Sequence, residues 1–318
     1  MKIRFRVYAT IWKIGEIFSI YYGPLLLLFF ILSFILKSTL FYAATLIYFI
    51  SFIRKLFVFS ESSYLKCFRL SLNRKKNYQI QVTPSLKADI YFANQKEAPC
   101  LIFLYGGGFI SGDISQHQDL SQYWSKGTYH IVYIDYPLAI NGDYKNCFEK
   151  TLEAVEKLLS YSDPRFKPSS FSLGGRSAGG FLALQIASSN LGNKIENIIV
   201  FYPPVNIVNW LKLKTSKILL PIIDLKLFFK GTNLDELNIT EDRLSRKIRY
   251  YFFLAENDLM VPTDDTFKLL NALKQKNFHF QVFNFKLCPH GFEANPFSLE
   301  GQRVCHQIFH IMNKINNT

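Results

Sequence analysis

The feature that most constrains this chain is an alternation, from Tyr78 onward, of short apolar runs with stretches of helical spacing. Polar–apolar alternation and short continuous apolar runs are both typical of strands, half-buried in the first case and fully buried in the second. We therefore expect strands at Tyr78–Val82, Asp89–Ala93, Cys100–Tyr105, Ile131–Tyr136, Phe171–Leu173, Asn197–Pro203, Ile248–Glu256 and Phe278–Lys286. We expect helices at Phe148–Tyr161, from Ala178 onward, and at Thr263–Lys274. Such an order favours βαβ units, and so an α/β fold whose mostly parallel central sheet carries helices on both faces.

A long apolar stretch precedes this region. Between Phe18 and Ile53 the only charged residue is Lys37. A single helix over residues 23–53 would be about 46 Å long, against roughly 30 Å for the hydrocarbon core of a bilayer. Breaking the stretch at Lys37, Ser38 and Thr39 gives two apolar segments, Phe18–Leu36 and Leu40–Ile53. We predict that residues 1–60 form a membrane anchor, a helical hairpin with spans near 18–36 and 40–53; the alternative is one tilted transmembrane helix followed by an interfacial one.

Basic residues flank the apolar stretch on both sides and supply most of the chain's net charge of +13. They are Lys2, Arg4, Arg6 and Lys13 before it, and Arg54, Lys55, Lys66, Arg69, Arg74, Lys75 and Lys76 after it. Flanks rich in lysine and arginine tend to stay in the cytoplasm, so a hairpin satisfies both and a single span does not. We expect residues 61–77 to be a basic juxtamembrane linker near anionic lipid, with the catalytic domain in the cytoplasm, although the Asn238 sequon would suit a lumen. No nucleic-acid partner is expected, because the basic clusters lack any nucleic-acid-binding motif.

The five cysteines are scattered and form no Cys-x-x-Cys pair. An odd, dispersed set fits neither a disulfide framework nor a zinc site. We expect no metal and no cofactor.

A candidate nucleophile lies between a predicted strand and a predicted helix. Gly175, Arg176, Ser177, Ala178 and Gly179 match the pattern G-x-S-x-G. A sharp strand-to-helix turn needs small neighbours, and it exposes the serine hydroxyl at the carboxyl edge of the sheet. On its own the same stretch also fits a plain glycine-rich turn, so the interpretation depends on the rest of the chain.

Partners for such a serine follow three other predicted strands. Glycines 106–108 follow one strand, and their amide groups could converge on the oxyanion of a tetrahedral intermediate. A plain turn or a phosphate loop is the alternative, but the phosphate-binding glycine patterns are missing. Asp258 and His290 each follow a later strand. A lone histidine or aspartate is more often structural, whereas a glycine loop, Ser, Asp and His in this order favour a catalytic triad.

At these residues the chain resembles α/β-hydrolases of the hormone-sensitive-lipase-like and acetyl-esterase type. The resemblance covers roughly residues 78–310 and rests on the motifs GGGF, DYPLA, GRSAGG, NDLMVP and HGF. It implies that Ser177 is the nucleophile, His290 the general base and Asp258 its orienting acid, with oxyanion-hole amides from Gly107, Gly108 and Ala178. Glu256, Asp264 and Asp265 compete with Asp258 for the acid role but match the family motif less well. The chain departs from the family at Tyr105, where histidine is usual, at Arg176, where aspartate is frequent, and at PLAIN, residues 137–141, where the family carries an Arg-Leu-Ala-Pro-Glu run.

We therefore predict an α/β-hydrolase catalytic domain over residues 78–318, with a helical cap insertion near 206–247. The insertion contains an apolar stretch at Ile218–Phe229, which would line a substrate pocket or simply pack against the sheet. The predicted function is a membrane-anchored serine carboxylesterase or deacetylase acting on short-chain or hydrophobic esters, small-molecule or lipid. Two alternatives stay open at this point: an acyl hydrolase or transferase with amide, peptide or glycan substrates, and a ligand-binding member of the fold without catalysis.

Overall fold

The computed structural model describes residues 78–114, 124–139, 143–212, 228–286, 288–294 and 299–316. The predicted membrane anchor, residues 1–60, and the basic linker, residues 61–77, lie outside these ranges. Among the helices that are described, none has the length and hydropathy of a membrane span.

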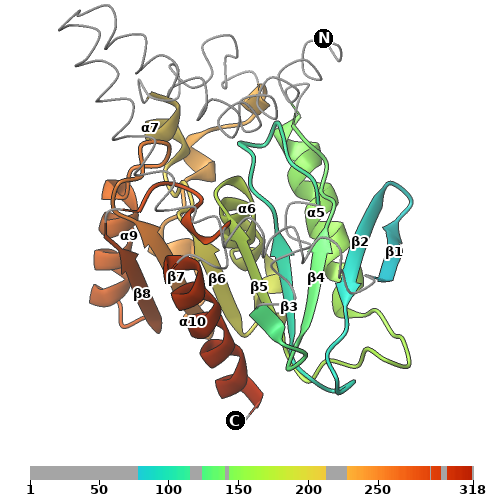
Figure 1. Ribbon diagram of the computed structural model, residues 1–318. Coiled ribbons are helices and arrows are strands. Elements are labelled where there is room, and N and C mark those ends of the chain that lie inside the picture. The colour runs from blue at the N-terminus through green and yellow to red at the C-terminus, as the bar shows by residue number, and fades with distance from the viewer. Residues whose placement is uncertain are drawn as a thin grey trace, which may run out of the picture. The chain divides into compact units, whose positions relative to one another are not determined.

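An eight-stranded sheet forms the centre of the described region (Figure 1). Its strands are β1 Tyr78–Thr83, β2 Leu86–Tyr91, β3 Cys100–Leu104, β4 His130–Ile134, β5 Phe171–Arg176, β6 Asn197–Phe201, β7 Arg249–Ala255 and β8 Phe280–Phe285. They lie in the order β1-β2-β4-β3-β5-β6-β7-β8. The pairs β1–β2 and β2–β4 are antiparallel, and every pair from β4 to β8 is parallel. The expected mostly parallel sheet is confirmed, although its second strand begins at Leu86 and not at Asp89.

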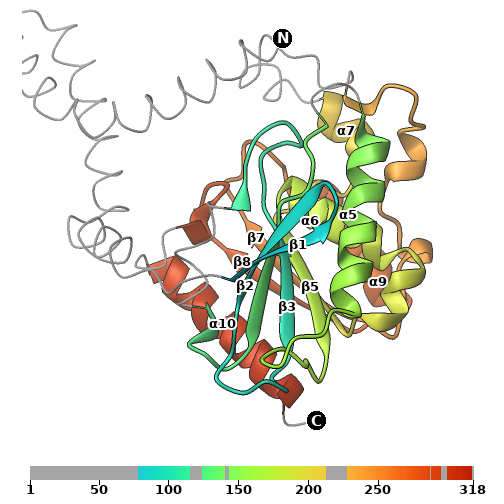
Figure 2. The same cartoon turned by 90° about the vertical axis from the view of Figure 1, so that its right-hand side faces the viewer.

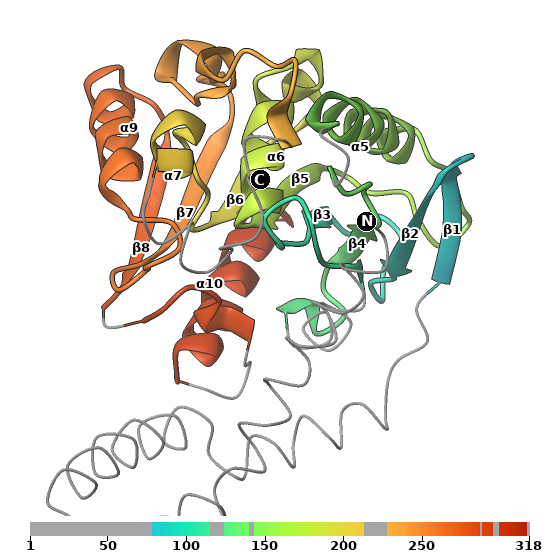
Figure 3. The ribbon, with the colours of Figure 1, turned by 90° about the horizontal axis from the view of Figure 1, so that it is seen from above.

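Helices cover both faces of the sheet. They are α5 Tyr144–Leu159, α6 Ala178–Ala187, α7 Ile207–Lys212, α9 Asp264–Gln275 and α10 Leu299–Asn316, with short 3-10 turns η2 Asn190–Lys194, η4 Asp235–Leu237, η5 Glu241–Arg243 and η6 Phe292–Ala294. Figures 2 and 3 show α5, α6 and α9 on one face and α10 on the other. Helix α10 is absent from the sequence-based expectations. Of the predicted cap, the described part holds α7, η4 and η5, and residues 213–227 lie outside it.

Burial explains the local structure of the central elements. Every residue of β3, β4 and β6 is buried, as their continuous apolar runs predict. All ten residues of α6 are buried as well, so this helix lies in the core instead of presenting a polar face. Helix α5 is amphipathic, and its N-terminus is capped by the Asp143 carboxylate, which accepts from the Asn146 amide at 3.0 Å.

The carboxyl ends of parallel strands lie at the same edge of a sheet, and in this protein the candidate site residues follow those ends. The glycine loop follows β3, Ser177 follows β5 and Tyr202 follows β6. Asp258 lies three residues beyond β7, and His290 follows β8. Ligands of open parallel sheets bind outside the carboxyl ends of the strands, so a binding site is expected at this edge.

Candidate active site

Ser177 occupies a strained backbone conformation between β5 and α6. Its φ of 51° and ψ of −122° fall in a region that side-chain-bearing residues rarely adopt. The Ser177 amide donates to the Phe201 carbonyl at 2.9 Å, and the Ser177 carbonyl accepts from the Phe181 amide at 3.0 Å. Strain of this kind costs on the order of 1–3 kcal/mol and is characteristic of functional turns. The sharp strand-to-helix turn predicted around Ser177 is therefore present in the backbone.

Close backbone packing explains the glycines around the serine. A Cβ atom at Gly175 would lie 2.4 Å from the Gly179 backbone, and one at Gly179 would lie 2.2 Å from the Tyr105 carbonyl oxygen. Neither position can hold a larger residue without moving backbone. A Cβ atom at Gly106 would lie 3.3 Å from the Ser177 Cβ, so the glycine loop runs directly beside the serine.

The glycine loop itself has a conformation that only glycine adopts easily. Gly107 and Gly108 have φ of 140° and 62°, and Phe109 follows at 67°. The Gly107 carbonyl turns inward to accept from the amides of Ile110 and Ser111, at 3.1 and 3.0 Å. Within the described part of the chain, the Gly107 and Gly108 amides donate to no group.

The third predicted oxyanion donor, Ala178, is the first residue of α6. The first amides of a helix have no intrahelical acceptor, and they lie at the positive end of the helix dipole. The Ala178 amide can therefore point to a developing negative charge on the substrate next to Ser177.

Aromatic packing fixes the loop from behind. The Phe109 ring contacts the rings of Tyr144, Phe181, Trp210 and Phe229 in edge-to-face geometry, with centroids 5.6–6.3 Å apart. The Phe109 carbonyl accepts from the Ala139 amide at 2.7 Å. The loop is thus held by side chains of α5, α6 and α7 and by the segment after β4.

Tyr105, which stands where the family usually has histidine, forms a reciprocal clamp with Tyr136. The Tyr105 hydroxyl donates to the Tyr136 carbonyl at 2.6 Å, and the Tyr136 hydroxyl donates to the Tyr105 carbonyl at 2.7 Å. The two rings stack with centroids 4.0 Å apart. Burial raises the pKa of both phenols, so the hydroxyls stay protonated donors. The clamp joins the ends of β3 and β4 at the base of the glycine loop.

Asp258 and His290 lie in direct contact. His290 Nδ1 and Asp258 Oδ2 are 2.6 Å apart, with the Asp258 side chain fully buried and the His290 side chain 16% exposed. The other carboxylate oxygen, Oδ1, accepts from the amides of Met260 and Val261 at 2.9 and 2.8 Å. The carboxylate is therefore fixed by its own loop and holds His290 through Nδ1, while Nε2 has no hydrogen-bond partner among the described residues.

The competing acids lie elsewhere. Asp264 and Asp265 belong to the first turn of α9, and the Asp265 carboxylate accepts from Asn209 at 3.0 and 3.2 Å and pairs with Lys268 at 3.1 Å. Glu256 is exposed. Of the four candidates, Asp258 is the one bonded to a histidine within the described residues.

Tyr202 follows, in sequence, the residue bonded to Ser177, and it contacts the His290 ring directly. The Ser177 amide is bonded to the carbonyl just before Tyr202, and the His290 ring lies 4.1 Å from the Tyr202 ring, centroid to centroid. No hydrogen bond joins Ser177 Oγ to His290 in the described residues. Catalytic hydrogen bonds often tighten only when substrate is bound.

Other reactive groups among the described residues include cysteine thiols and possible metal ligands. Burial raises the pKa of Cys288, the thiol nearest His290 in sequence, to about 11, so it is not a thiolate at neutral pH. Across the described ranges no three side chains among His, Cys, Asp and Glu lie close enough to hold a metal ion.

Comparison with known families decides the fold family. A family model described as the alpha/beta hydrolase fold matches residues 101–294, which is more than half of the chain and runs from β3 through Ala294. The chain belongs to the alpha/beta hydrolase fold family. The resemblance drawn from the motifs is thereby confirmed.

Solved structures of this fold family lie close to the chain in architecture. A hyperthermophilic esterase from the archaeon Pyrobaculum calidifontis superposes with a TM-score of 0.60 at 19% identity, covering 84% of this chain and 94% of that one. Esterase B from Lactobacillus rhamnosis superposes with a TM-score of 0.64 at 13% identity, covering 83% of this chain and 96% of that one. EstE1, a carboxylesterase cloned from a metagenomic library, gives 0.59 at 20% identity, with 80% and 95% covered. At such identities the likeness establishes the shared fold. A search of curated protein sequences gave no significant match.

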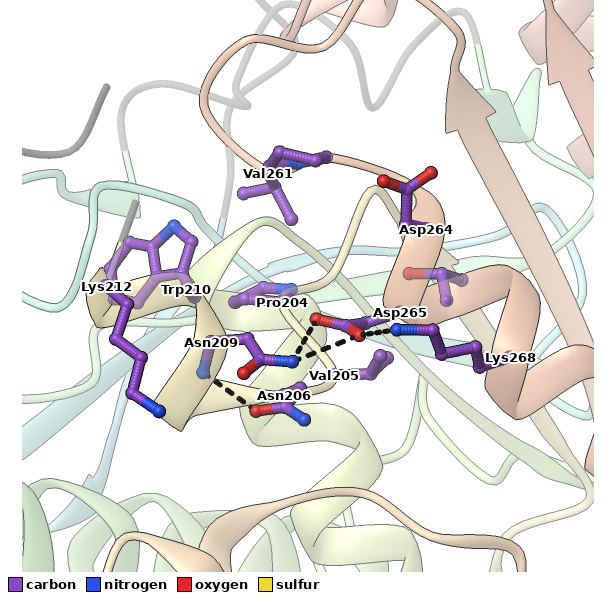
Figure 4. A pocket seen from close by; sticks show the side chains of 12 residues that line it. Pro204, Val205, Asn206, Asn209, Trp210, Lys212, Val261, Asp264, Asp265 and Lys268 are labelled. Carbon is purple, nitrogen blue, oxygen red and sulfur yellow. Dashed lines mark hydrogen bonds and ion pairs between the residues drawn. The ribbon is translucent and has the colours of Figure 1, made fainter. Parts of the chain in front are cut away.

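Next to the site, this α/β-hydrolase has a cavity of about 330 Å³ between α7 and α9 (Figure 4). Its lining residues follow β6 and β7 or belong to the two helices: Pro204, Val205, Asn206, Asn209, Trp210, Lys212, Val261, Pro262, Asp264, Asp265, Thr266 and Lys268. The Trp210 indole donates to the Met260 carbonyl at 3.0 Å, which ties the first cap helix to the Asp258 loop.

Three residues of the site escaped the sequence-based prediction. Arg176 and the buried Glu293 form a partly buried ion pair, and the Tyr202 hydroxyl donates to the same Glu293 oxygen. Arg176 was noted only as a departure from the family pattern. Tyr202 ends an apolar strand and Glu293 follows the HGF motif, but no local pattern relates residues this far apart in the sequence.

Proposed function

We propose that the chain is a serine carboxylesterase or deacetylase that hydrolyses short-chain or hydrophobic esters through an acyl-enzyme on Ser177. The observation that carries this proposal is the strained elbow at Ser177, which lies beside the glycine loop and at the same edge of the sheet as the bonded Asp258–His290 pair. The match to the alpha/beta hydrolase fold and the esterase titles of the structural neighbours support it.

The proposed reaction begins at Ser177. His290 Nε2 removes the hydroxyl proton as the Ser177 oxygen attacks the ester carbonyl carbon. The carbonyl π electrons move to the oxygen, where the amides of Gly107, Gly108 and Ala178 donate to it. Collapse of this intermediate breaks the C–O bond, and His290 returns the proton to the departing alcohol.

Water then repeats the sequence on the acyl-enzyme. His290 removes a proton from water, hydroxide adds to the acyl carbon, and the Ser177 oxygen leaves with the proton from His290. Asp258 stays ionised throughout, because its role is to orient the imidazole and to stabilise its positive charge.

The test measures hydrolysis of p-nitrophenyl esters of increasing acyl length by the detergent-solubilised full-length chain. Ser177→Ala is expected to remove turnover by a factor of about 10⁴ or more, since a triad loses most of its effect with any one member. Ser188→Ala, at the other end of α6, is the matched control and should keep wild-type activity. The acyl length with the highest kcat/KM measures the size of the pocket.

Two other outcomes would redirect the proposal. Ser177-dependent release of amine or acyl transfer to another acceptor, without ester hydrolysis, would indicate an amide, peptide or glycan substrate. A folded wild type with no Ser177-dependent turnover on esters or amides would favour a ligand-binding protein and contradict the proposed esterase.

We also propose that residues 1–60 anchor the enzyme in a membrane, as a hairpin that leaves the catalytic domain in the cytoplasm. The support is the length and apolarity of the stretch and the basic residues on both flanks. The full-length chain should stay with the membrane pellet after extraction at alkaline pH, and in sealed cytoplasm-out vesicles the catalytic domain should be open to protease. Release by alkali would contradict the anchor, and protection from protease would contradict the orientation.

A further inference from the structure

Arg176 and Glu293 connect the two segments that carry the proposed nucleophile and base. Arg176 precedes Ser177, and Glu293 lies in η6, three residues after His290. Arg176 Nη1 and Glu293 Oε1 are 3.4 Å apart, and their side chains are 14% and 0% exposed. An ion pair so far from solvent is weakly screened, and it acts as a bridge across 117 residues of sequence.

Tyr202 completes the bridge and contacts His290 directly. Its hydroxyl donates to Glu293 Oε1, and its ring lies against the imidazole with centroids 4.1 Å apart. Tyr202 itself has a φ of 36°, an unusual value for a bulky residue. Burial and the nearby Glu293 carboxylate raise the pKa of Tyr202, so the hydroxyl remains a donor.

The position of Glu293 depends on these two partners. Its second oxygen, Oε2, is buried and has no hydrogen-bond partner among the described residues. Burying a carboxylate costs free energy unless it is paired. The contacts with Arg176 and Tyr202 therefore fix the position of Glu293 and of the segment after His290.

We propose that Arg176 and Glu293 are positioning residues, which hold the His290 segment against the nucleophile elbow and keep the charge beside His290 balanced. The inference rests on the proposed esterase function. It assigns a role to Arg176, one of the positions at which the chain departs from the family pattern.

Charge balance follows from what faces His290. Asp258 is bonded to Nδ1, and Tyr202 covers the ring. Glu293 lies behind Tyr202, neutralised by Arg176. Cys288 is a protonated thiol near Glu300 and Arg303 of α10, whose charges oppose each other. Removing the Glu293 carboxylate takes one negative charge from this set, which makes the surroundings of the imidazolium more positive.

The test is the pH dependence of p-nitrophenyl acetate hydrolysis by full-length Glu293→Gln. We expect kcat to fall about 10-fold to 100-fold with KM nearly unchanged, because only the alignment of Ser177 and His290 is impaired. The acid limb of kcat/KM should move to lower pH by roughly half a unit to one unit, because loss of the Glu293 carboxylate makes the surroundings of the imidazolium more positive. The double variant Arg176→Met with Glu293→Gln removes both charges and should return the limb to its wild-type position.

Two further variants serve as controls. Asp163→Asn breaks an ion pair with Arg165 that is remote from the site and more exposed, and it should leave kcat and the limb unchanged. Arg176→Lys keeps the charge and should leave the limb in place. If Glu293→Gln does not fold, Tyr202→Phe removes only the hydroxyl, and the same fall in kcat at constant KM is expected.

A second readout separates this inference from the esterase proposal. The ¹³Cε1 signal of His290, assigned with His290→Asn, should titrate at lower pH in Glu293→Gln than in the wild type, whether or not an ester is hydrolysed. A wild type without Ser177-dependent turnover would refute the proposed function. The titration of His290 would then still test the role of the Arg176–Glu293 pair. An unmoved limb and an unmoved titration in a folded Glu293→Gln would overturn the inference.

Discussion

Single residues in this protein are constrained mainly where backbone meets backbone. Gly107 is the sharpest case: its φ is 140°, and a Cβ atom there would lie 1.9 Å from the Ser111 carbonyl oxygen. The clash is with backbone, so no rotamer change relieves it. The residue therefore combines a conformational requirement with a proposed catalytic one.

Gly107→Ala is expected to lower kcat about 10²-fold to 10³-fold, the usual cost of losing an oxyanion donor, because the loop must move away from Ser177. The measurement is kcat on p-nitrophenyl acetate together with the melting temperature. Gly231→Ala is the matched control, since Gly231 also has a positive φ, 77°, but no atom within 4 Å of a Cβ. Equal kinetic effects of the two variants would contradict the role of the loop.

At the scale of elements, side chains join the ends of neighbouring strands. The Tyr105–Tyr136 clamp links β3 to β4, and Ser177 is linked to β6 through the Phe201 carbonyl. Carbonyl groups at the ends of strands have lost their ladder partners and, when buried, need another donor. The clamp supplies one to each tyrosine carbonyl.

Tyr105→Phe and Tyr136→Phe should each destabilise the fold by about 1–3 kcal/mol, because each leaves a buried carbonyl without its donor. The loss of unfolding free energy in the double variant should differ from the sum of the two single losses, since the two hydroxyls close one ring of contacts. Chemical unfolding of the four proteins measures this coupling. Tyr129→Phe is the control: the Tyr129 hydroxyl is buried with no partner in the described part of the chain, so its loss should be close to neutral.

At the scale of the whole molecule, one histidine outside the site links stability to pH. His130, at the start of β4, is fully buried; its Nδ1 accepts from the Ala93 amide at 3.0 Å and its Nε2 faces the Lys96 carbonyl at 3.1 Å. Burial lowers the pKa of His130, and the Lys96 carbonyl opposes this only in part. The folded protein therefore holds this ring neutral.

The unfolded chain takes up a proton at His130 below about pH 6.5, whereas the folded chain does not. Stability should thus be unaffected by this group above that pH, and it should fall by up to about 1.4 kcal/mol per pH unit below it, until the depressed folded-state pKa is reached. Melting temperatures of His130→Asn should decline less between pH 7.5 and 5.5 (about two units) than those of the wild type. His279→Asn, at an exposed histidine, should decline as the wild type does; an identical decline in all three proteins would refute the assignment.

The sequence by itself determined the strand positions and the turn at Ser177, because both follow from patterns between neighbouring residues. Apolar runs located the strands to within a few residues, and strand-to-helix glycines located Ser177, because both signals act between near neighbours in the chain. The order of the glycine loop, Ser177, Asp258 and His290 then predicted the family, which the match confirmed. The helix α10 was missed although Val304, Ile308 and Ile311 have helical spacing.

Only the tertiary structure decided which distant side chains meet. The Asp258–His290 contact, the Tyr105–Tyr136 clamp and the Arg176–Glu293–Tyr202 bridge each join segments that are far apart in sequence. Such contacts depend on strand order and on the backbone angles at the carboxyl edge of the sheet, and no local pattern encodes these. Arg176 is the clearest example: in the sequence it is an exception to a motif, and in the fold it is the counter-charge of a buried carboxylate beside the proposed catalytic histidine.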